Sequence, residues 1–145
     1  MALPGLDNSF TVSVPLGDDA STAYYTSGYF RTIPLPIGYL WEVTGFEVSA
    51  ATDYAAQDTN YNTVTLTDSS GNSIASVANG PESTGVDFDV NPATGIDSSM
   101  TAGYKRIDCS AAAGYLKITT AITGAGRTHV GLMAHVTVKG LRNPS

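Results

Sequence analysis

The fold is decided by THVGLMAHVTVKG, the stretch that spans residues 128–140. Every second position of this stretch is apolar: Val130, Leu132, Ala134, Val136 and Val138. Successive side chains of a β-strand point to opposite faces of the sheet. The alternation therefore predicts a long strand with one buried face and one solvent-facing face.

Further segments are also typical of strands, and residues that favour turns separate them. These segments are residues 9–16, 24–33, 39–50, 62–67, 73–78, 86–90, 104–109 and 114–123. Helical candidates are confined to the Ala-rich residues 50–57 and 110–113, which are too short for more than a turn or two. The pattern predicts an all-β fold: a single antiparallel β-sandwich over residues 1–145, jelly-roll-like, with about eight or nine strands.

The strongest local signal is the β-hairpin expected from residues 62–78. Val64 and Leu66 share one face of its first strand. In the turn that follows, Asp68 can accept hydrogen bonds from the backbone ahead of it, and Gly71 can adopt a positive φ.

Two other features interrupt the strands. The alternation within residues 39–50 is imperfect, and Gly45 predicts a β-bulge at that point. Pro34 and Pro36 predict that the strand before them ends at Ile33, because proline cannot donate a hydrogen bond to a neighbouring strand.

Composition limits the classes of function. The chain has 145 residues, of which 42% are hydrophobic and 14% are charged, against about 25% charged in a typical globular protein. Its formal net charge of −6 argues against a nucleic-acid partner, because phosphate binding needs clustered Lys and Arg. No apolar run approaches the roughly 20 residues that cross a bilayer, and the first residues lack the pattern of a signal peptide. We therefore expect no membrane partner and synthesis in a cytoplasm.

Candidate catalytic residues are few. Cys109 is the only cysteine, and a lone cysteine at a strand end is more often a small buried residue than a nucleophile. His129 and His135 share one face of the last strand, but at about 3.3 Å per residue they lie roughly 20 Å apart. They cannot hold one metal ion together and are expected at the surface or in an interface. We expect no catalytic site, no enzyme activity and no cofactor.

The best candidate for a divalent cation lies near the middle of the chain. Asp87 and Asp89 share a strand face, and Asn91 stands in the turn that follows. Carboxylate and amide oxygens are ligands that Ca²⁺ prefers. However, the apolar residues between the acids explain the same pattern as an amphipathic strand, which is the favoured interpretation.

Aromatic residues concentrate between residues 24 and 41. Tyr24 and Tyr25 are neighbours, so one of them must face outward in a regular strand, and outward tyrosine is typical of protein–protein interfaces. The alternative is a glycan-binding site with exposed aromatic faces beside polar side chains. Its residues would be Tyr54, Asp58, Asn60 and Tyr61. We favour the interface.

Two stretches carry a resemblance to a known family. They are VTLTDSSGNSIAS, residues 64–76, and the Gly-bounded strands that run from Gly114 through Gly124 and Gly126 to Val138. They resemble small structural proteins of tailed bacteriophages, in particular capsid decoration (cement) proteins built on a jelly roll or related β-sandwich. The resemblance is one of pattern. It covers roughly the second half of the chain and residues 41–50, and it includes no catalytic or ligand motif.

The resemblance implies a homotrimer on the exterior of a phage capsid, made in the host cytoplasm, with the major capsid protein as its partner. Residues 1–8 and 141–145 would be arms that order on that partner. The expected contact residues are Leu3, Leu6, Tyr24, Tyr25, Tyr29, Phe30, Leu141 and Arg142. The alternatives are a glycan-binding module or receptor-binding head of a tail fibre, and a minor tail or head–tail joining protein.

Overall fold

The computed structural model describes residues 8–16, 30–49, 59, 61–78, 106–124 and 133–142. Most of these residues lie in strands, and none of them is helical. The strands are β1 (Asn8–Pro15), β2 (Phe30–Leu35), β3 (Tyr39–Ser49), β4 (Tyr61–Asp68), β5 (Ser73–Ala78), β6 (Arg106–Asp108), β7 (Gly114–Thr123) and β8 (Met133–Arg142). The described ranges accordingly hold no helix that could cross a membrane.

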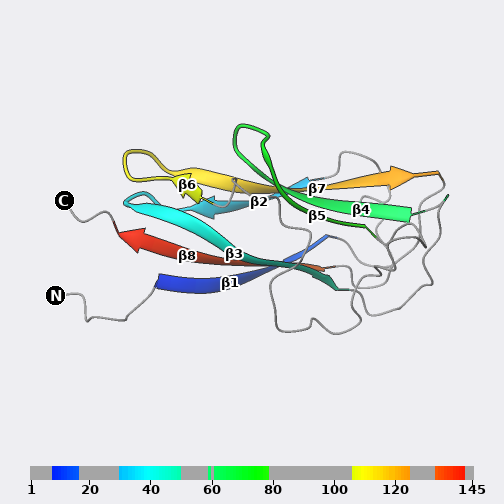
Figure 1. Cartoon of the computed structure of the whole chain (residues 1–145), viewed down its shortest axis with the longest axis horizontal. Helices are drawn as coiled ribbons and strands as arrows, with labels where there is room; N and C mark the ends of the chain where they lie inside the picture. The colour runs from blue at the N-terminus through cyan, green and yellow to red at the C-terminus, as the bar shows by residue number, and fades with distance from the viewer. Residues whose placement is uncertain are drawn as a thin grey trace.

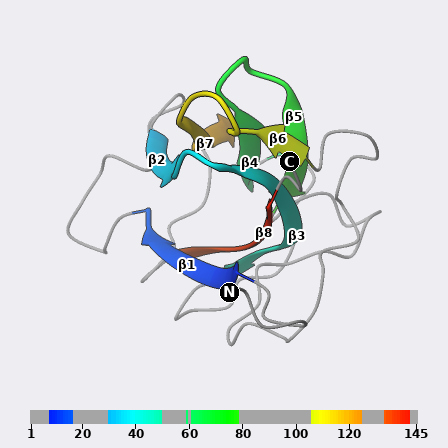
Figure 2. The same ribbon diagram turned by 90° about the vertical axis from the view of Figure 1, so that its left-hand side faces the viewer.

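The strands form two antiparallel sheets of four strands each, which stack face to face (Figures 1 and 2). Sheet A has the order β1-β8-β3-β6, and sheet B has the order β2-β7-β4-β5. The strands pair from the two ends of the series inward: β1 with β8, β2 with β7, β3 with β6 and β4 with β5. A double ribbon wrapped into two sheets in this way is a jelly roll. The predicted all-β sandwich is confirmed.

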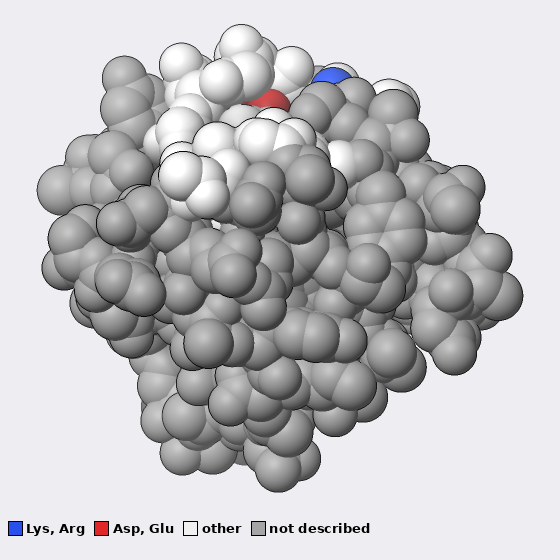
Figure 3. Space-filling view, turned by 90° about the vertical axis from the view of Figure 1, so that its right-hand side faces the viewer, with Lys and Arg blue, Asp and Glu red and all other residues white. Residues whose placement is uncertain are grey.

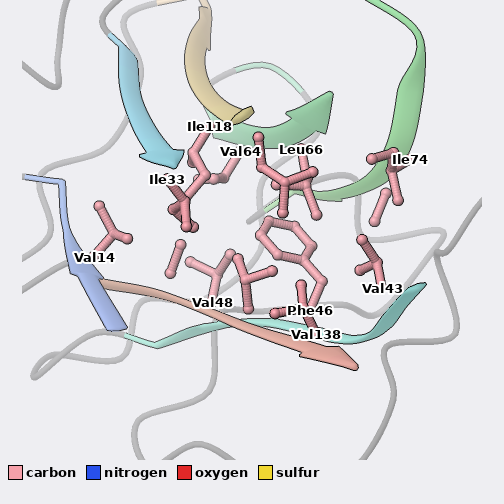
Figure 4. Packing of buried hydrophobic residues seen from close by; sticks show 14 of the residues in the cluster. Val14, Ile33, Val43, Phe46, Val48, Val64, Leu66, Ile74, Ile118 and Val138 are labelled. Atoms are coloured by element: carbon pink, nitrogen blue, oxygen red, sulfur yellow. The ribbon is translucent and has the colours of Figure 1, made fainter. Parts of the chain in front are cut away.

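Hydrophobic side chains fill the space between the sheets. From β8, Ala134, Val136 and Val138 are each at most 1% exposed, as the alternation in residues 128–140 predicts. Phe46 of β3 lies between the two sheets and is completely buried (Figure 4). Burying a side chain of this size contributes roughly 1.5–3 kcal/mol, so this cluster is the main source of stability.

A β-bulge in β3 brings both halves of that strand onto the core. The register of β3 against β8 shifts between Val43 and Gly45, so Thr44 is the extra residue. Because of this extra residue, Val43 before the bulge and Phe46 after it both face inward, although in a regular strand they would point to opposite sides. The bulge predicted at Gly45 is confirmed.

The predicted hairpin forms from β4 and β5. The Asp68 carboxylate accepts hydrogen bonds of 2.9 Å from the backbone N–H groups of Ser70 and Asn72. Gly71 has a φ of 87°, in the left-handed region that favours glycine. The turn therefore has the chemistry that the sequence predicts.

Two local predictions are wrong. β2 continues through Pro34 to Leu35, beyond its predicted end. It is an edge strand with a neighbour on one side only, and proline is tolerated on such a strand because its nitrogen can face away from the sheet. In the helical candidate 110–113, residues 110–112 form a bend rather than a helical turn. There the Asp108 side chain accepts hydrogen bonds from the N–H and hydroxyl of Ser110, which compete with helix formation.

Several other predicted segments lie partly or wholly outside the residues that the structure describes. The segment 86–90, the helical candidate 50–57 and residues 24–29, 104–105 and 128–132 lie outside the described residues.

The connections between strands differ in length at the two ends of the sandwich. The short turns, residues 36–38, 69–72 and 109–113, lie at one end, which we call the short-loop end. The longer connections leave and enter the strands at the opposite end, which we call the long-loop end (Figure 1). Asn8 pairs with Gly140, so β1 begins and β8 ends at the short-loop end.

Candidate interaction surface

The short-loop end displays large hydrophobic side chains to solvent. Phe10 in β1, Ile37 in the β2–β3 turn and Tyr115 in β7 are 37%, 57% and 41% exposed. Among the described residues one more large hydrophobic side chain is exposed, Phe30, at the start of β2, where it pairs with Thr119 in the middle of β7. Several exposed hydrophobic side chains at one end of a domain are typical of an interaction surface.

An aromatic cluster lies beneath this surface in sheet A. Phe10 packs edge-on against Trp41, with ring centroids 5.4 Å apart and planes at 77°. The Tyr39 and Trp41 ring centroids are 5.1 Å apart. Gly140 leaves room for these rings, because a Cβ atom there would lie 3.0 Å from the Trp41 ring and 3.1 Å from Tyr39. Aromatic pairs of this kind contribute about 0.5–1.5 kcal/mol each beyond their burial.

Hydrogen bonds hold the turn that carries Ile37. The Gly38 N–H donates to the Cys109 carbonyl (2.8 Å), and the Cys109 N–H donates to the Tyr39 carbonyl (2.9 Å). The Trp41 indole N–H donates to the Pro36 carbonyl (2.9 Å). Gly38 has a φ of 104°, which only glycine adopts readily. The exposed Ile37 side chain is therefore presented by a rigid turn.

Charged groups at this end are mostly satisfied locally. The Arg106 Nε lies 2.9 Å from the Glu42 Oε2, but the Arg106 side chain is 64% exposed, so the pair adds little stability. Hydrogen bonds from the Ser110 hydroxyl and N–H hold the pKa of Asp108 below its ordinary value, against a small opposing effect of desolvation. Asp108 therefore stays ionised at neutral pH.

Cys109 is a small buried residue, as the sequence predicts. It is 1% exposed, and a Cβ atom at Gly114 would lie 3.1 Å from its sulfur. Burial raises the pKa of the Cys109 thiol; a backbone hydrogen bond from Gly114 opposes this rise, and the charge of Asp108 adds to it. The thiol is therefore neutral at physiological pH, the form that is a poor nucleophile.

The predicted contact residues fall at two separate places. Phe30 is 52% exposed on sheet B, where the Lys117 ammonium lies 4.3 Å from its ring centroid. Leu141 is half-buried in sheet A at the short-loop end, paired with Leu40. The structure therefore does not bring Phe30 and Leu141 together. Leu3, Leu6, Tyr24, Tyr25 and Tyr29 lie outside the described residues, as does the side chain of Arg142.

The alternative sites fall mostly outside the described residues. This applies to the calcium candidates Asp87, Asp89 and Asn91, to the glycan candidates Tyr54, Asp58 and Asn60, and to His129. Tyr61 is half-buried at the start of β4. No group of three or more metal-ligating side chains occurs within the ranges that the structure describes.

His135 links three strands on the outer face of sheet A. Its Nδ1 lies 2.8 Å from the Ser13 hydroxyl of β1, and its Nε2 lies 2.7 Å from the Ser49 hydroxyl of β3. It is half-buried rather than a fully exposed surface histidine. We assign it a structural role, because both ring nitrogens have hydrogen-bond partners within the sheet.

Sequence reasoning missed Ile37. Its signal is the run Pro34-Leu35-Pro36-Ile37-Gly38, in which rigid residues and a glycine flank an apolar one. A hydrophobic side chain inside turn chemistry has no strand face on which to be buried, so it is exposed.

The strand order and the hydrophobic interior define the chain as a jelly-roll β-sandwich. No protein-family model, curated protein sequence or solved structure matches it.

Proposed function

We propose that this chain is a virion structural protein that binds the outside of an assembled phage capsid and stabilises it. The observation that carries the proposal is a jelly roll with a hydrophobic core and with exposed hydrophobic side chains on a rigid short-loop end. Jelly rolls occur in viral capsid and lectin domains. A site built from exposed Ile37 and Tyr115 is suited to burial against another protein surface.

The mechanism is binding energy alone. A protein that binds the assembled shell better than the separate subunits stabilises the shell by mass action, roughly 2.7 kcal/mol per site at one hundred times the dissociation constant. The net charge of −6 keeps the free protein soluble at the concentrations that saturation requires. The partner is the major capsid protein, and the chain acts as a homotrimer made in the host cytoplasm.

Co-sedimentation tests this proposal. The purified chain is mixed with shells assembled from the major capsid protein of the same genome, and in parallel with that protein unassembled. We expect saturable pelleting with shells and at least tenfold weaker association with unassembled subunits. No association with shells in either low or physiological salt would rule out the proposed function.

A glycan-binding module is the second candidate, and one observation favours it. The outer face of sheet B carries Tyr61 on β4 and Tyr115 on β7, with threonines along β4 and with Lys117, Thr119 and Ala121 along β7 between them. At the long-loop end the described part of the surface is small and shows a basic and an acidic side chain among uncharged ones (Figure 3). A glycan array decides this point: selective binding that Tyr115→Ala abolishes would support the module, and uniform background signal would exclude it.

A further inference from the structure

We propose that the short-loop end, and not the long-loop end, is the face that meets the capsid. The inference rests on the proposed function and names its contact surface. The partner is a major capsid subunit. An apolar depression on that subunit receives Ile37, with Phe10 and Tyr115 beside it.

The exposed residues at this end are connected through a chain of contacts. Phe10 packs on Trp41, and Trp41 donates a hydrogen bond to Pro36, which adjoins Ile37. On sheet B, Pro34 of β2 pairs with Tyr115 of β7. The two sheets therefore contribute to one end surface through the β2–β3 connection.

This surface is already ordered before it binds. The Gly38 and Cys109 hydrogen bonds fix the turn, and Pro34 and Pro36 restrict the backbone on one side of Ile37. Binding through fixed side chains avoids much of the ordering cost, which is about 0.5–1.5 kcal/mol for each immobilised side chain. The Ile37 side chain is 57% exposed, so a partner that covers it removes much apolar surface from water, which stabilises the complex.

The chain on either side of the described residues joins the sandwich at the same end. Asn8 pairs with Gly140, so residues 1–7 are attached beside the aromatic cluster. Fully extended, seven residues span about 23–25 Å, enough to extend contacts well beyond the end surface. Leu3 and Leu6 in this segment are apolar, in keeping with the apolar chemistry of the proposed depression.

A matched pair of substitutions tests the inference. Ile37→Asp places a charge at the short-loop end, and Phe30→Asp places one at a similarly exposed position away from that end, opposite Thr119 in the middle of β7. Both positions are more than half exposed, so we expect both variants to fold, with melting temperatures close to that of the wild type. In co-sedimentation with assembled shells, Ile37→Asp should weaken binding tenfold or more, and Phe30→Asp less than threefold.

A photo-reactive amino acid at position 37 or 30 gives an independent readout. We expect a crosslink to the major capsid protein from position 37 and none from position 30. Wild-type retention by Ile37→Asp, or an equal loss in both variants, would overturn the inference while leaving capsid binding intact. A fall in native mass for Ile37→Asp would also overturn it, because the short-loop end would then be a contact between copies of the chain. If the wild-type chain itself does not bind shells, the proposed function fails, and this inference fails with it.

Discussion

Gly140 and Trp41 occupy the same small region at the end of sheet A. The nearest atoms to a Cβ on Gly140 would be Trp41 Cζ3 at 3.0 Å, and Trp41 Cη2 and Tyr39 Cδ1 at 3.1 Å. The indole cannot move aside freely, because its N–H donates to the Pro36 carbonyl. Glycine at this position is therefore a packing requirement.

We predict that Gly140→Ala lowers the free energy of unfolding by about 1–3 kcal/mol, the usual cost of overpacking. Trp41→Phe removes both clashing indole atoms, so adding Gly140→Ala to that variant should cost less. Urea unfolding followed by far-ultraviolet circular dichroism measures all four proteins of the cycle. A simple sum of the two single effects would show that the indole is not the obstacle.

Asp68 supplies the acceptors of the β4–β5 turn. Partial burial raises the pKa of its carboxyl, but hydrogen bonds from Asn72, Ser70 and Gly71 outweigh that effect, and the net pKa lies below its ordinary value. A lowered folded-state pKa means that the stabilisation is complete above the unfolded-state pKa, about 3.9. It is lost as the pH falls through the folded-state pKa.

We predict that Asp68→Ala lowers the free energy of unfolding by about 1 kcal/mol at pH 7, because backbone N–H groups lose a charged acceptor. Asp68→Asn keeps one oxygen acceptor and should cost less. Unfolding curves between pH 2 and pH 7 provide the test. The wild type should lose more stability below about pH 4 than Asp68→Asn does, and identical acid profiles for the two would contradict the assignment.

At the scale of the element, β3 carries one residue more than its pairing needs. With Thr44 removed, Val43 and Gly45 become neighbours, and regular alternation already turns Trp41, Val43, Phe46 and Val48 inward. The bulge therefore absorbs an extra residue without changing which side chains are buried.

We predict that deletion of Thr44 is tolerated and lowers the free energy of unfolding by less than about 2 kcal/mol. This value includes the loss of the Thr44 hydrogen bond to the Thr137 carbonyl. Deletion of Glu42 in the same strand should be far more damaging, because it turns Trp41 away from the core; loss of such a side chain costs about 3–5 kcal/mol. Thermal unfolding of the two deletion variants distinguishes them. Equal destabilisation would mean that the bulge itself is required.

The elements predicted best from sequence are those whose own residues determine them. The alternation in β8 and the Asp68 and Gly71 turn depend on neighbours in the chain, and both were predictable. The strand end predicted at Ile33 was wrong because the edge position of β2 depends on which strands pair. Residue 116 of β7 pairs with residue 33, a contact between segments distant in sequence. The strand order 1-8-3-6 and 2-7-4-5 is likewise a property of the tertiary structure.

At the scale of the whole molecule, the candidate surface was only partly predictable. The sequence pointed to both Leu141 and Phe30 but could not show that they lie apart, Leu141 in sheet A at the short-loop end and Phe30 in sheet B opposite the middle of β7. Ile37 becomes prominent only when the β2–β3 turn is seen beside β1 and β7. A surface assembled from three segments has no local pattern by which to be recognised.

We predict a native mass of three times 15.0 kDa, or 45 kDa, for the free protein. Light scattering after size-exclusion chromatography measures it directly. A monomer at every concentration up to about 100 µM would contradict a trimer that exists before capsid binding. In that case, threefold association on the capsid would be supported only by shells that saturate at multiples of three copies.

The most direct test of the account is the thermal stability of assembled shells with and without this chain. Shells saturated with the protein should break open at a higher temperature, and the increase should grow with protein concentration until the sites are full. A disruption temperature that the saturating protein leaves unchanged would contradict the central claim that this jelly roll binds and stabilises a capsid.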